Sequence, residues 1–280
     1  MNLSEFFSLL LFIALAIPDV IRAKLRSYYP AKYQHRRTVV ALPYSPFCEK
    51  VFWALDRCKA EYATRTVFQG FFPTTLMEFS AGSVPIVVDS GSVLKDSKLV
   101  LESLADEGHT WLYPSEQVRE MEREFGDAFG RAVARVVYHH LFSTPEGCAL
   151  LRRIWKVDTS PLERHLCEPL FPAIRMAMLS GLDIPQGLPG FVATVDEVFA
   201  RVSELLADGR KYICATPEMT AADITFASLA YPLVLPQEKA AVFVSWADEL
   251  PNEFRAAVGR LREGLAGQFV LRLYSEERHL

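Results

Sequence analysis

The stretch Tyr44-Ser45-Pro46-Phe47-Cys48 brings a hydroxyl and a thiol to within three residues of each other. It follows a short apolar run and precedes a segment with helical periodicity, so both groups would lie at the N-terminal end of a helix. Unpaired backbone N–H groups and the positive end of the helix dipole stabilise a thiolate held there. The stretch therefore predicts a site for thiolate chemistry. The alternative is an N-cap Ser45 beside a buried, inert Cys48.

Strands and helices alternate around this stretch. Short β-branched or apolar runs predict strands, and apolar residues at helical spacing predict helices. Four strands and two helices are expected, with strands at 38–42, 62–68, 86–88 and 92–94 and helices at 48–58 and 97–104. An Asp-Ser-Gly turn joins the last two strands, and Asp96 is suited to capping the second helix. The first part of the chain is therefore expected to be an α/β domain.

The composition changes after about Gly108, where the strand signals end. Residues 116–141 keep apolar side chains on one face, which predicts a long amphipathic helix, and everything downstream is helical or irregular. Five prolines suggest a loop-rich connection between helices: Pro161, Pro169, Pro172, Pro185 and Pro189. Thr220 and Asp223 form a capping-box pattern, a structural rather than catalytic feature. An all-α part thus follows the α/β part.

Composition excludes several classes of protein. Half of the 280 residues are hydrophobic and 23% are charged, so the chain is not disordered. A net charge of −4 gives no field to hold a polyanion, which argues against a nucleic-acid partner. The five cysteines are scattered without a C-x-x-C pair, and the adjacent His139 and His140 point in different directions on a helix. We expect no disulfide framework and no metal, and reduced thiols in a reducing, cytoplasmic compartment.

The N-terminal segment carries an apolar run from Phe6 to Pro18, followed by basic residues. The basic residues come after the run, which is the wrong order for a secretory signal peptide. The run is short for a membrane span unless Asp19 lies in the interface. Residues 3–21 are therefore expected either to contact a membrane, with the rest of the chain on the cytoplasmic side, or to form a helix on the globular body.

Two further motifs stand at the starts of later elements. Val84-Pro85 precedes a strand, where a cis proline would leave the backbone of Val84 free to pair with a bound peptide, although an ordinary trans proline opening an edge strand is commoner. Asp96-Ser97 opens a helix, where an acid, a hydroxyl and free amides suit an amino-acid head group, or simply cap the helix. Each motif is weak evidence alone. Together with the Ser45 stretch they are stronger evidence, because each stands at the start of a predicted strand or helix.

These residues and this order of elements resemble the glutathione transferase family, from Val39 to the C-terminus. The resemblance implies an α/β plus all-α fold: a thioredoxin-like N-terminal domain followed by an all-helical C-terminal domain. The expected boundaries are 1–37 for an N-terminal extension, 38–108 for the glutathione-binding domain and 109–280 for the helical domain. Ser-Pro-Phe-Cys is similar to the glutaredoxin and omega-class Cys-Pro loop with serine in place of the first cysteine.

The resemblance also implies roles for these residues. Ser45 and Cys48 are the catalytic candidates, with Ser45 stabilising the thiolate of glutathione, the co-substrate, by a hydrogen bond. Val84 and Pro85 would hold the cysteinyl part. Asp96 would pair with the γ-glutamyl ammonium, and Ser97 would hold its carboxylate. No metal is implied.

Two departures from the family pattern concern affinity for glutathione. The residue before Val84 is Ser83 rather than Lys or Gln, and residues 71–75 are aromatic and offer no basic group for the glycyl carboxylate. Arg131 and Arg135 are candidates for that role, unless they belong to a solvated helix face.

The second substrate would be a small hydrophobic electrophile, as in a detoxification enzyme that forms two-fold dimers. Its pocket would be lined by Tyr44, Phe129 and Tyr138, unless these belong to the core. Two rival interpretations stay open. One is a glutathione-dependent thiol reductase or peroxidase that uses Cys48. The other is a non-catalytic binding module tethered by its N-terminal segment.

Overall fold

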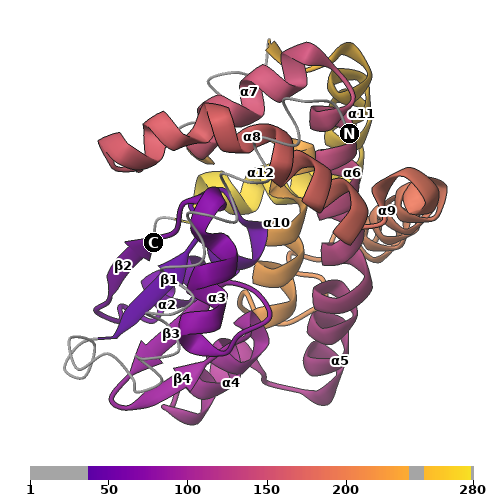
Figure 1. Ribbon diagram of the computed structural model, residues 1–280. Coiled ribbons are helices and arrows are strands. Elements are labelled where there is room, and N and C mark those ends of the chain that lie inside the picture. Colours follow the sequence, from indigo (N-terminus) through magenta and orange to yellow (C-terminus); the bar gives the residue numbers. More distant parts are fainter. Residues whose placement is uncertain (1–36, 240–248, 279–280) are drawn as a thin grey trace.

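The computed structural model describes residues 37–239 and 249–278 (Figure 1). The expectation about membrane contact by residues 3–21 lies outside the described residues. Within the described ranges, no helix is both long enough and apolar enough to cross a membrane.

A four-stranded sheet forms the core of the first part. The strands are β1 (Thr38–Ala41), β2 (Ala63–Thr66), β3 (Ile86–Asp89) and β4 (Ser92–Leu94), in the order β2-β1-β3-β4. β1 pairs in parallel with β2 and antiparallel with β3, and β3 pairs antiparallel with β4. Every residue of β1 is buried. This explains its unbroken β-branched and apolar sequence, since a central strand covered on both faces has no solvent side.

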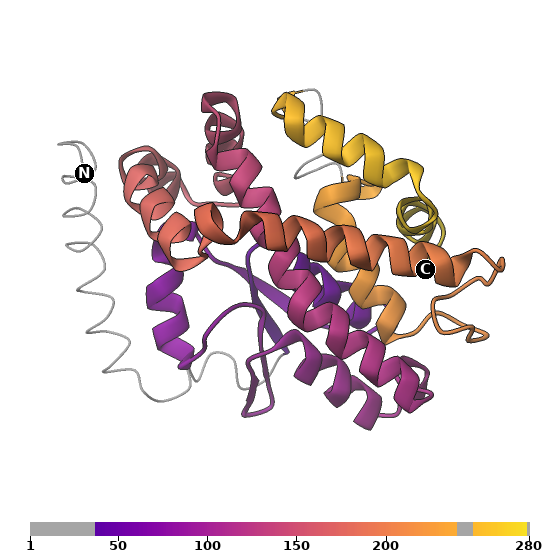
Figure 2. The same ribbon diagram turned by 90° about the vertical axis from the view of Figure 1, so that its right-hand side faces the viewer.

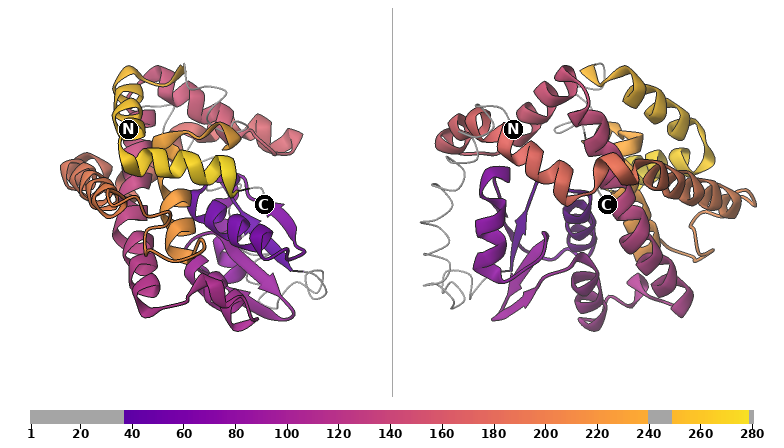
Figure 3. Two further views of the ribbon diagram at one scale, coloured as in Figure 1. Left: turned by 180° about the vertical axis from the view of Figure 1, so that it is seen from behind. Right: turned by 45° about the vertical axis from the view of Figure 1, so that its right-hand side comes forward.

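Helices cover both faces of this sheet. α3 (Phe72–Phe79) covers one face, and α2 (Pro46–Arg57) and α4 (Ser97–Asp106) cover the other (Figure 3). The sequence patterns predicted the four strands, α2 and α4. They did not predict α3, which follows the short 3-10 turn η2 (Gln69–Phe71), because its aromatic and threonine residues are poor helix formers.

The remainder of the described chain is helical. Its elements are η3 (Thr110–Leu112), α5 (Glu116–Glu124), η4 (Phe125–Phe129), α6 (Gly130–Phe142), α7 (Pro145–Trp155), α8 (Pro161–Gly181), α9 (Ile184–Leu206), α10 (Ala221–Val234), η5 (Gln237–Lys239), α11 (Asn252–Glu263) and α12 (Leu265–Glu276). The long helix predicted over 116–141 is α5, a π turn and α6 in continuous succession (Figure 2). The described chain thus has the predicted fold class, a small thioredoxin-like sheet followed by a helical assembly.

The prediction of a loop-rich proline segment was wrong. Pro161 stands in the first turn of α8, where its missing N–H costs nothing, and Ser160 and Glu163 form a capping box there. Pro169 and Pro172 lie inside α8, where each removes one backbone donor. Burial of apolar α8 side chains such as Phe171 offsets that loss.

α10 lies at the centre of the molecule, and all of its residues are buried. It packs against α2 on one side and against α5, α6, α11 and α12 on the others (Figure 1). A helix that is apolar all round must be enclosed in this way. The hydroxyl of Tyr231 on α10 donates a hydrogen bond to the carbonyl of Tyr44 at 2.6 Å, which joins the helical part to the loop before α2.

Candidate functional site

The strand register brings the three sequence motifs to one edge of the sheet. Ile86, the first residue of β3, pairs with Val40 near the end of β1, so Val84-Pro85 lies beside the point where the chain leaves β1 for Ser45. β4 runs antiparallel to β3, so its C-terminal end, which leads to Asp96, lies at the same edge. Segments some fifty residues apart in sequence therefore meet in space.

Ser45 is the N-cap of α2 and is half-buried. Its side-chain oxygen accepts a hydrogen bond from the backbone N–H of Cys48 at 3.4 Å, and its own N–H donates to the carbonyl of Leu42 at 3.0 Å. Pro46 at the first helical position has the fixed φ that a helix start favours. The helix start thus holds the Ser45 hydroxyl at the positive end of α2.

Cys48 lies one turn into α2 with no exposed surface. Burial raises the pKa of its thiol to about 12, and hydrogen bonds with the Ser45 side chain and the Leu42 backbone only partly oppose this effect. The interpretation of Cys48 as the working group required an exposed thiol with a lowered pKa. The structure gives the opposite environment, so near neutral pH Cys48 is a neutral, inaccessible thiol.

Three ion pairs that the sequence patterns did not predict fix α2 in place. Glu49 is almost fully buried and pairs with Lys239 at 2.5 Å and with Arg278 at 2.8 Å. Lys50, equally buried, pairs with Glu122 on α5. The partners are 72 to 229 residues away in sequence, so no local pattern signalled them. Breaking a buried pair is costly, which makes α2 a rigid support for Ser45.

The Val84–Pro85 peptide bond is cis, as the resemblance implies, and both residues are buried, whereas Ser83 is exposed. Asp96 is the N-cap of α4, and its carboxylate accepts a hydrogen bond from the N–H of Lys98 at 2.7 Å. Ser97 is buried beside it. Both the functional and the capping interpretation of Asp96 are compatible with this geometry.

A cavity of about 320 Å³ opens beside Asp96 and Ser97. Phe47, from the loop that carries Ser45, forms part of its wall, and α5 and η4 close the other side. Gly130 on α6 makes room for this arrangement, because a Cβ there would lie 2.5 Å from the Phe47 ring. The other charged lining residues are of both signs: Lys50, Lys98, Glu122, Arg123 and Asp127. The cavity can therefore receive a group with both an ammonium and a carboxylate.

The residues expected to line a second pocket belong to the core. Phe129 is fully buried and stacks on Phe226 at a centroid distance of 5.5 Å. Tyr44 is buried, and its hydroxyl donates to Gln69 at 2.7 Å. Tyr138 stacks on Phe142. These side chains are committed to packing, the alternative that the sequence left open.

Arg135 was a candidate for holding a carboxylate. Its Nε donates to the carbonyl of Leu182 at 2.8 Å, and its guanidinium lies over the ring of Phe191. This side chain joins α6 to the start of α9, whereas Arg131 is exposed. Neither arginine lines the cavity beside Asp96.

The Thr220–Asp223 box is present at the start of α10. Asp223 is buried, and its carboxylate accepts hydrogen bonds from the N–H and hydroxyl of Thr220 and from the N–H of Ile213, all within 2.9 Å. Burial raises the pKa of Asp223, while these hydrogen bonds act in the opposite direction. Within residues 37–239 and 249–278, no cluster of His, Cys, Asp and Glu is arranged to hold a metal ion.

Residues 44–107 match the family model described as glutathione S-transferase, N-terminal domain. The matched segment runs from the Ser45 loop through α4. No curated protein sequence matches the chain.

Solved structures resemble the chain over both parts. Glutathione transferase GSTFuA2 from Phanerochaete chrysosporium superposes with a TM-score of 0.56 at 14% identity, covering 86% of this chain and 98% of that one. Glutathione S-transferase CsGST63524 of Ceriporiopsis subvermispora, in complex with glutathione, gives 0.55 at 16%, with 86% and 97% covered. Beta-etherase LigF from Sphingobium gives 0.50 at 16%, with 85% and 99% covered. The chain has the fold of these proteins.

Proposed function

We propose that the protein is a glutathione-dependent transferase. Glutathione lies at the edge of the sheet where β1 and β4 end and β3 begins, with its cysteinyl part against Val84 and Pro85 and its γ-glutamyl end at Asp96 and Ser97. One observation carries the proposal: the strand register and the starts of α2 and α4 gather these segments and Ser45 at a single edge. The solved complex of the similar CsGST63524 with glutathione supports it.

The cavity beside α4 supports the placement of the γ-glutamyl end. An α-amino acid group is a zwitterion, and the cavity wall offers carboxylates for its ammonium and cations for its carboxylate. The N-terminal amides of α4 add donors for the carboxylate, because the first N–H groups of a helix have no partner within the helix.

Ser45 activates the thiol of the bound tripeptide. Its hydroxyl donates a hydrogen bond to the sulfur once the thiol has lost its proton to solvent, and this favours the charged form. The thiolate then attacks an electrophilic carbon of a hydrophobic second substrate. A C–S bond forms, and the electron pair of the broken bond leaves with the departing group. The proposal includes a two-fold dimer and a cytoplasmic location, with membrane contact through residues 3–21.

Calorimetric titration of reduced glutathione tests the proposal, together with the ultraviolet absorbance of the bound thiolate followed against pH. Ser45→Ala is expected to raise the bound thiol's pKa by about 1 to 2 units, because a hydrogen bond to a charged group is lost. Binding should change little, since the backbone and α4 contacts remain. Cys48→Ser is the matched control and should leave that pKa unchanged.

Different results would overturn different parts of the proposal. An unchanged thiol pKa in Ser45→Ala, with activity lost in Cys48→Ser, would favour the reductase or peroxidase alternative. The burial of Cys48 argues against that outcome. No binding by wild type at millimolar glutathione would leave the fold as a binding module without this chemistry.

A further inference from the structure

The end of α12 lies along one face of α2 (Figure 3). The contacts come from Tyr274 in the last turn of α12 and from Glu277 and Arg278, which follow it. On α2 they are made by four residues: Glu49, Trp53, Asp56 and Arg57. Steps of three and four residues keep side chains on one side of a helix. The contacts therefore extend along α2 from its first turn to its last.

Glu49 is the residue of this face that lies nearest to the proposed site. Its carboxylate is almost fully buried and accepts hydrogen bonds from the Nε of Arg278 at 2.8 Å and from the Nζ of Lys239. The Nη1 of Arg278 also pairs with Asp56 at 2.8 Å, and its guanidinium lies over the ring of Trp53 at 5.6 Å. Two cations thus face two carboxylates, so the charges of this group balance.

The backbone joins Glu49 directly to Ser45. The N–H of Glu49 donates to the carbonyl of Ser45 at 3.0 Å, and the N–H of Cys48 donates to the Ser45 side chain at 3.4 Å. Glu49 is about 6 Å from Ser45 along the helix axis, whereas Arg57 is about 18 Å away. A displacement of Glu49 therefore reaches the Ser45 hydroxyl through one turn of helix.

The opposite end of the same face has an ion pair of its own. The Nη1 of Arg57 lies 3.3 Å from Glu277, whose carboxylate also accepts from the hydroxyl of Tyr212 and pairs with Lys211 at 3.2 Å. The side chains of Arg57 and Arg278 are 20% and 11% exposed. The two arginine pairs are thus similarly buried and differ in their distance from Ser45.

We propose that Arg278 is a positioning residue for the transferase reaction: through Glu49 it holds the first turn of α2 where the Ser45 hydroxyl reaches the sulfur of glutathione. The pair of Arg57 with Glu277 stabilises α2 without this role. A buried carboxylate that loses one of its two cations keeps an uncompensated charge, and it moves towards the remaining cation or towards water. The role rests on the proposed function, because it assigns Ser45 to the glutathione thiol.

The pKa of the bound glutathione thiol separates positioning from simple stabilisation. Arg278→Gln should raise that pKa by roughly 0.5 to 1 unit, less than Ser45→Ala, because the hydroxyl is displaced rather than removed. The Kd for glutathione should stay within about twofold, since the contacts at Val84 and α4 remain. Arg278→Lys keeps the cation and should recover most of the wild-type pKa. Arg57→Gln is the matched control, which should lower stability and leave that pKa unchanged.

Alkylation of Cys48 tests the same role without glutathione. Cys48 on α2 and Cys167 on α8 have no exposed surface, so iodoacetamide reaches either thiol only when the chain around it opens. Global unfolding exposes both, whereas loosening of the α2 start exposes Cys48 alone. Arg278→Gln should raise the ratio of Cys48 to Cys167 alkylation by roughly fivefold, as followed by mass spectrometry. Arg57→Gln should leave this ratio at its wild-type value.

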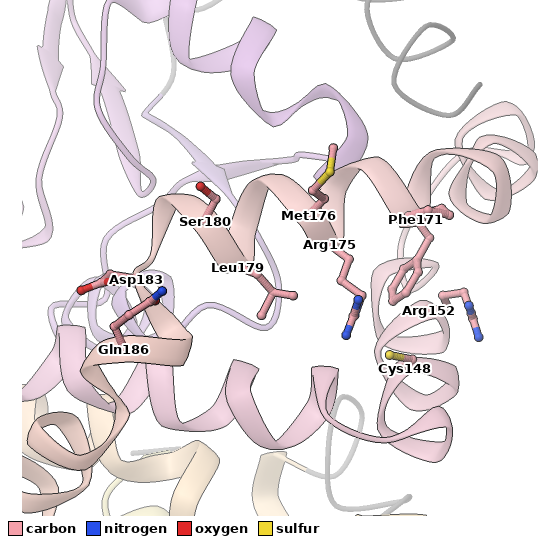
Figure 4. Close-up of a pocket in the computed structure, with 10 residues that line it drawn as sticks. Cys148, Arg152, Phe171, Arg175, Met176, Leu179, Ser180, Asp183 and Gln186 are labelled. Atoms are coloured by element: carbon pink, nitrogen blue, oxygen red, sulfur yellow. The ribbon is translucent and has the colours of Figure 1, made fainter. Parts of the chain in front are cut away.

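Cys148 is the reference for access of the reagent. Cys148 and Arg175 line a cavity of about 750 Å³ between α7 and α8, and Cys148 is half-buried there (Figure 4). Its alkylation should be equal in all of these variants, because α7 lies outside the contacts between α12 and α2.

The proposal fails if the pKa of the bound thiol in Arg278→Gln equals that in Arg57→Gln, whatever stability is lost. Such a result, with a raised pKa in Ser45→Ala, would remove this role and keep the transferase proposal. If wild type does not bind glutathione, the transferase proposal fails, and the alkylation ratio alone decides whether Arg278 holds the α2 start. Circular dichroism checks folding. If Arg278→Gln is unfolded, Lys239→Gln removes the other cation of Glu49 and takes its place, with the same expected results.

Discussion

Two helix starts in this molecule have a hydroxyl residue as N-cap but carry different side chains three positions later. At α10, Thr220 is the N-cap and Asp223 stands three positions later; at α2, Ser45 is the N-cap and Cys48 holds the corresponding position. The carboxylate of Asp223 accepts hydrogen bonds from both the N–H and the hydroxyl of Thr220. At α2 the corresponding hydrogen bond is longer: the side chain of Ser45 accepts from the N–H of Cys48 at 3.4 Å.

The residue three positions after the cap therefore decides how the hydroxyl is used. A carboxylate there is a strong acceptor and engages the hydroxyl of the cap permanently. A neutral thiol competes weakly, so the hydroxyl of Ser45 can turn to a ligand. The first arrangement stabilises the fold at the centre of the helical part, and the second leaves a donor at the edge of the sheet.

The largest expected effect is the loss of stability on replacing Asp223 at the start of α10. Asp223→Ala leaves three buried donors, two on Thr220 and one on Ile213, without an acceptor. We expect the free energy of unfolding to fall by roughly 3 kcal/mol or more, because each unsatisfied buried group costs about 1 to 3 kcal/mol. Urea denaturation followed by circular dichroism measures the change.

Asp196→Ala is the matched control for this variant. Asp196 pairs with Arg260 at 2.7 Å, but both side chains are largely exposed. Its loss should therefore cost less than about 1 kcal/mol. Equal losses in the two variants would show that the Asp223 box does not stabilise the fold beyond a surface pair.

A smaller effect on stability is expected at α2. Ser45→Ala removes one long capping hydrogen bond, and the free energy of unfolding should fall by roughly 0.5 to 1 kcal/mol. The same denaturation experiment measures it beside Asp223→Ala. A loss as large as that of Asp223→Ala would mean that Ser45 is itself a structural cap, and the contrast between the two helix starts would disappear.

The sequence predicted most of the fold because its signals are local. Strand runs, the Asp-Ser-Gly turn and the apolar face of residues 116–141 each depend on neighbouring residues. The prolines of α8 misled the prediction, because a proline's effect depends on whether its missing donor falls in the first turn, as for Pro161, or inside the helix, as for Pro169. Only the structure distinguishes these cases.

The candidate site was predicted by residue type but not by environment. Spacing indicated Ser45, Cys48 and Asp96, yet nothing local showed that Cys48 is sealed from solvent. The partners of Glu49 and Lys50 lie far away along the chain, and the cavity lined by Arg175 requires α7 and α8 to pack together. Burial and long-range pairing arise from tertiary packing, which a single sequence does not display.

A further expected effect concerns the pH dependence of stability at α2. The folded protein holds the pKa of Cys48 at about 12, whereas the ordinary value is 9.0. Between these values the unfolded chain releases a proton that the folded chain keeps, so rising pH favours unfolding. The contribution of Cys48 is complete below pH 9 and is lost as the pH rises towards 12. Cys48→Ala lacks this contribution, so its urea midpoint should fall less between pH 8 and pH 10.5 than that of wild type.

Ser45→Ala sharpens the same measurement. The hydrogen bond with Ser45 lowers the pKa of Cys48, against the larger effect of burial. Without the hydroxyl, that pKa rises further, and the midpoint of Ser45→Ala should fall at least as steeply as that of wild type over this pH range. Groups elsewhere titrate alike in all three proteins, so their contributions cancel in the comparison. A wild-type slope no steeper than that of Cys48→Ala would mean that the thiol ionises in the folded protein, and the α2 start would then offer a thiolate of its own as well as a hydroxyl.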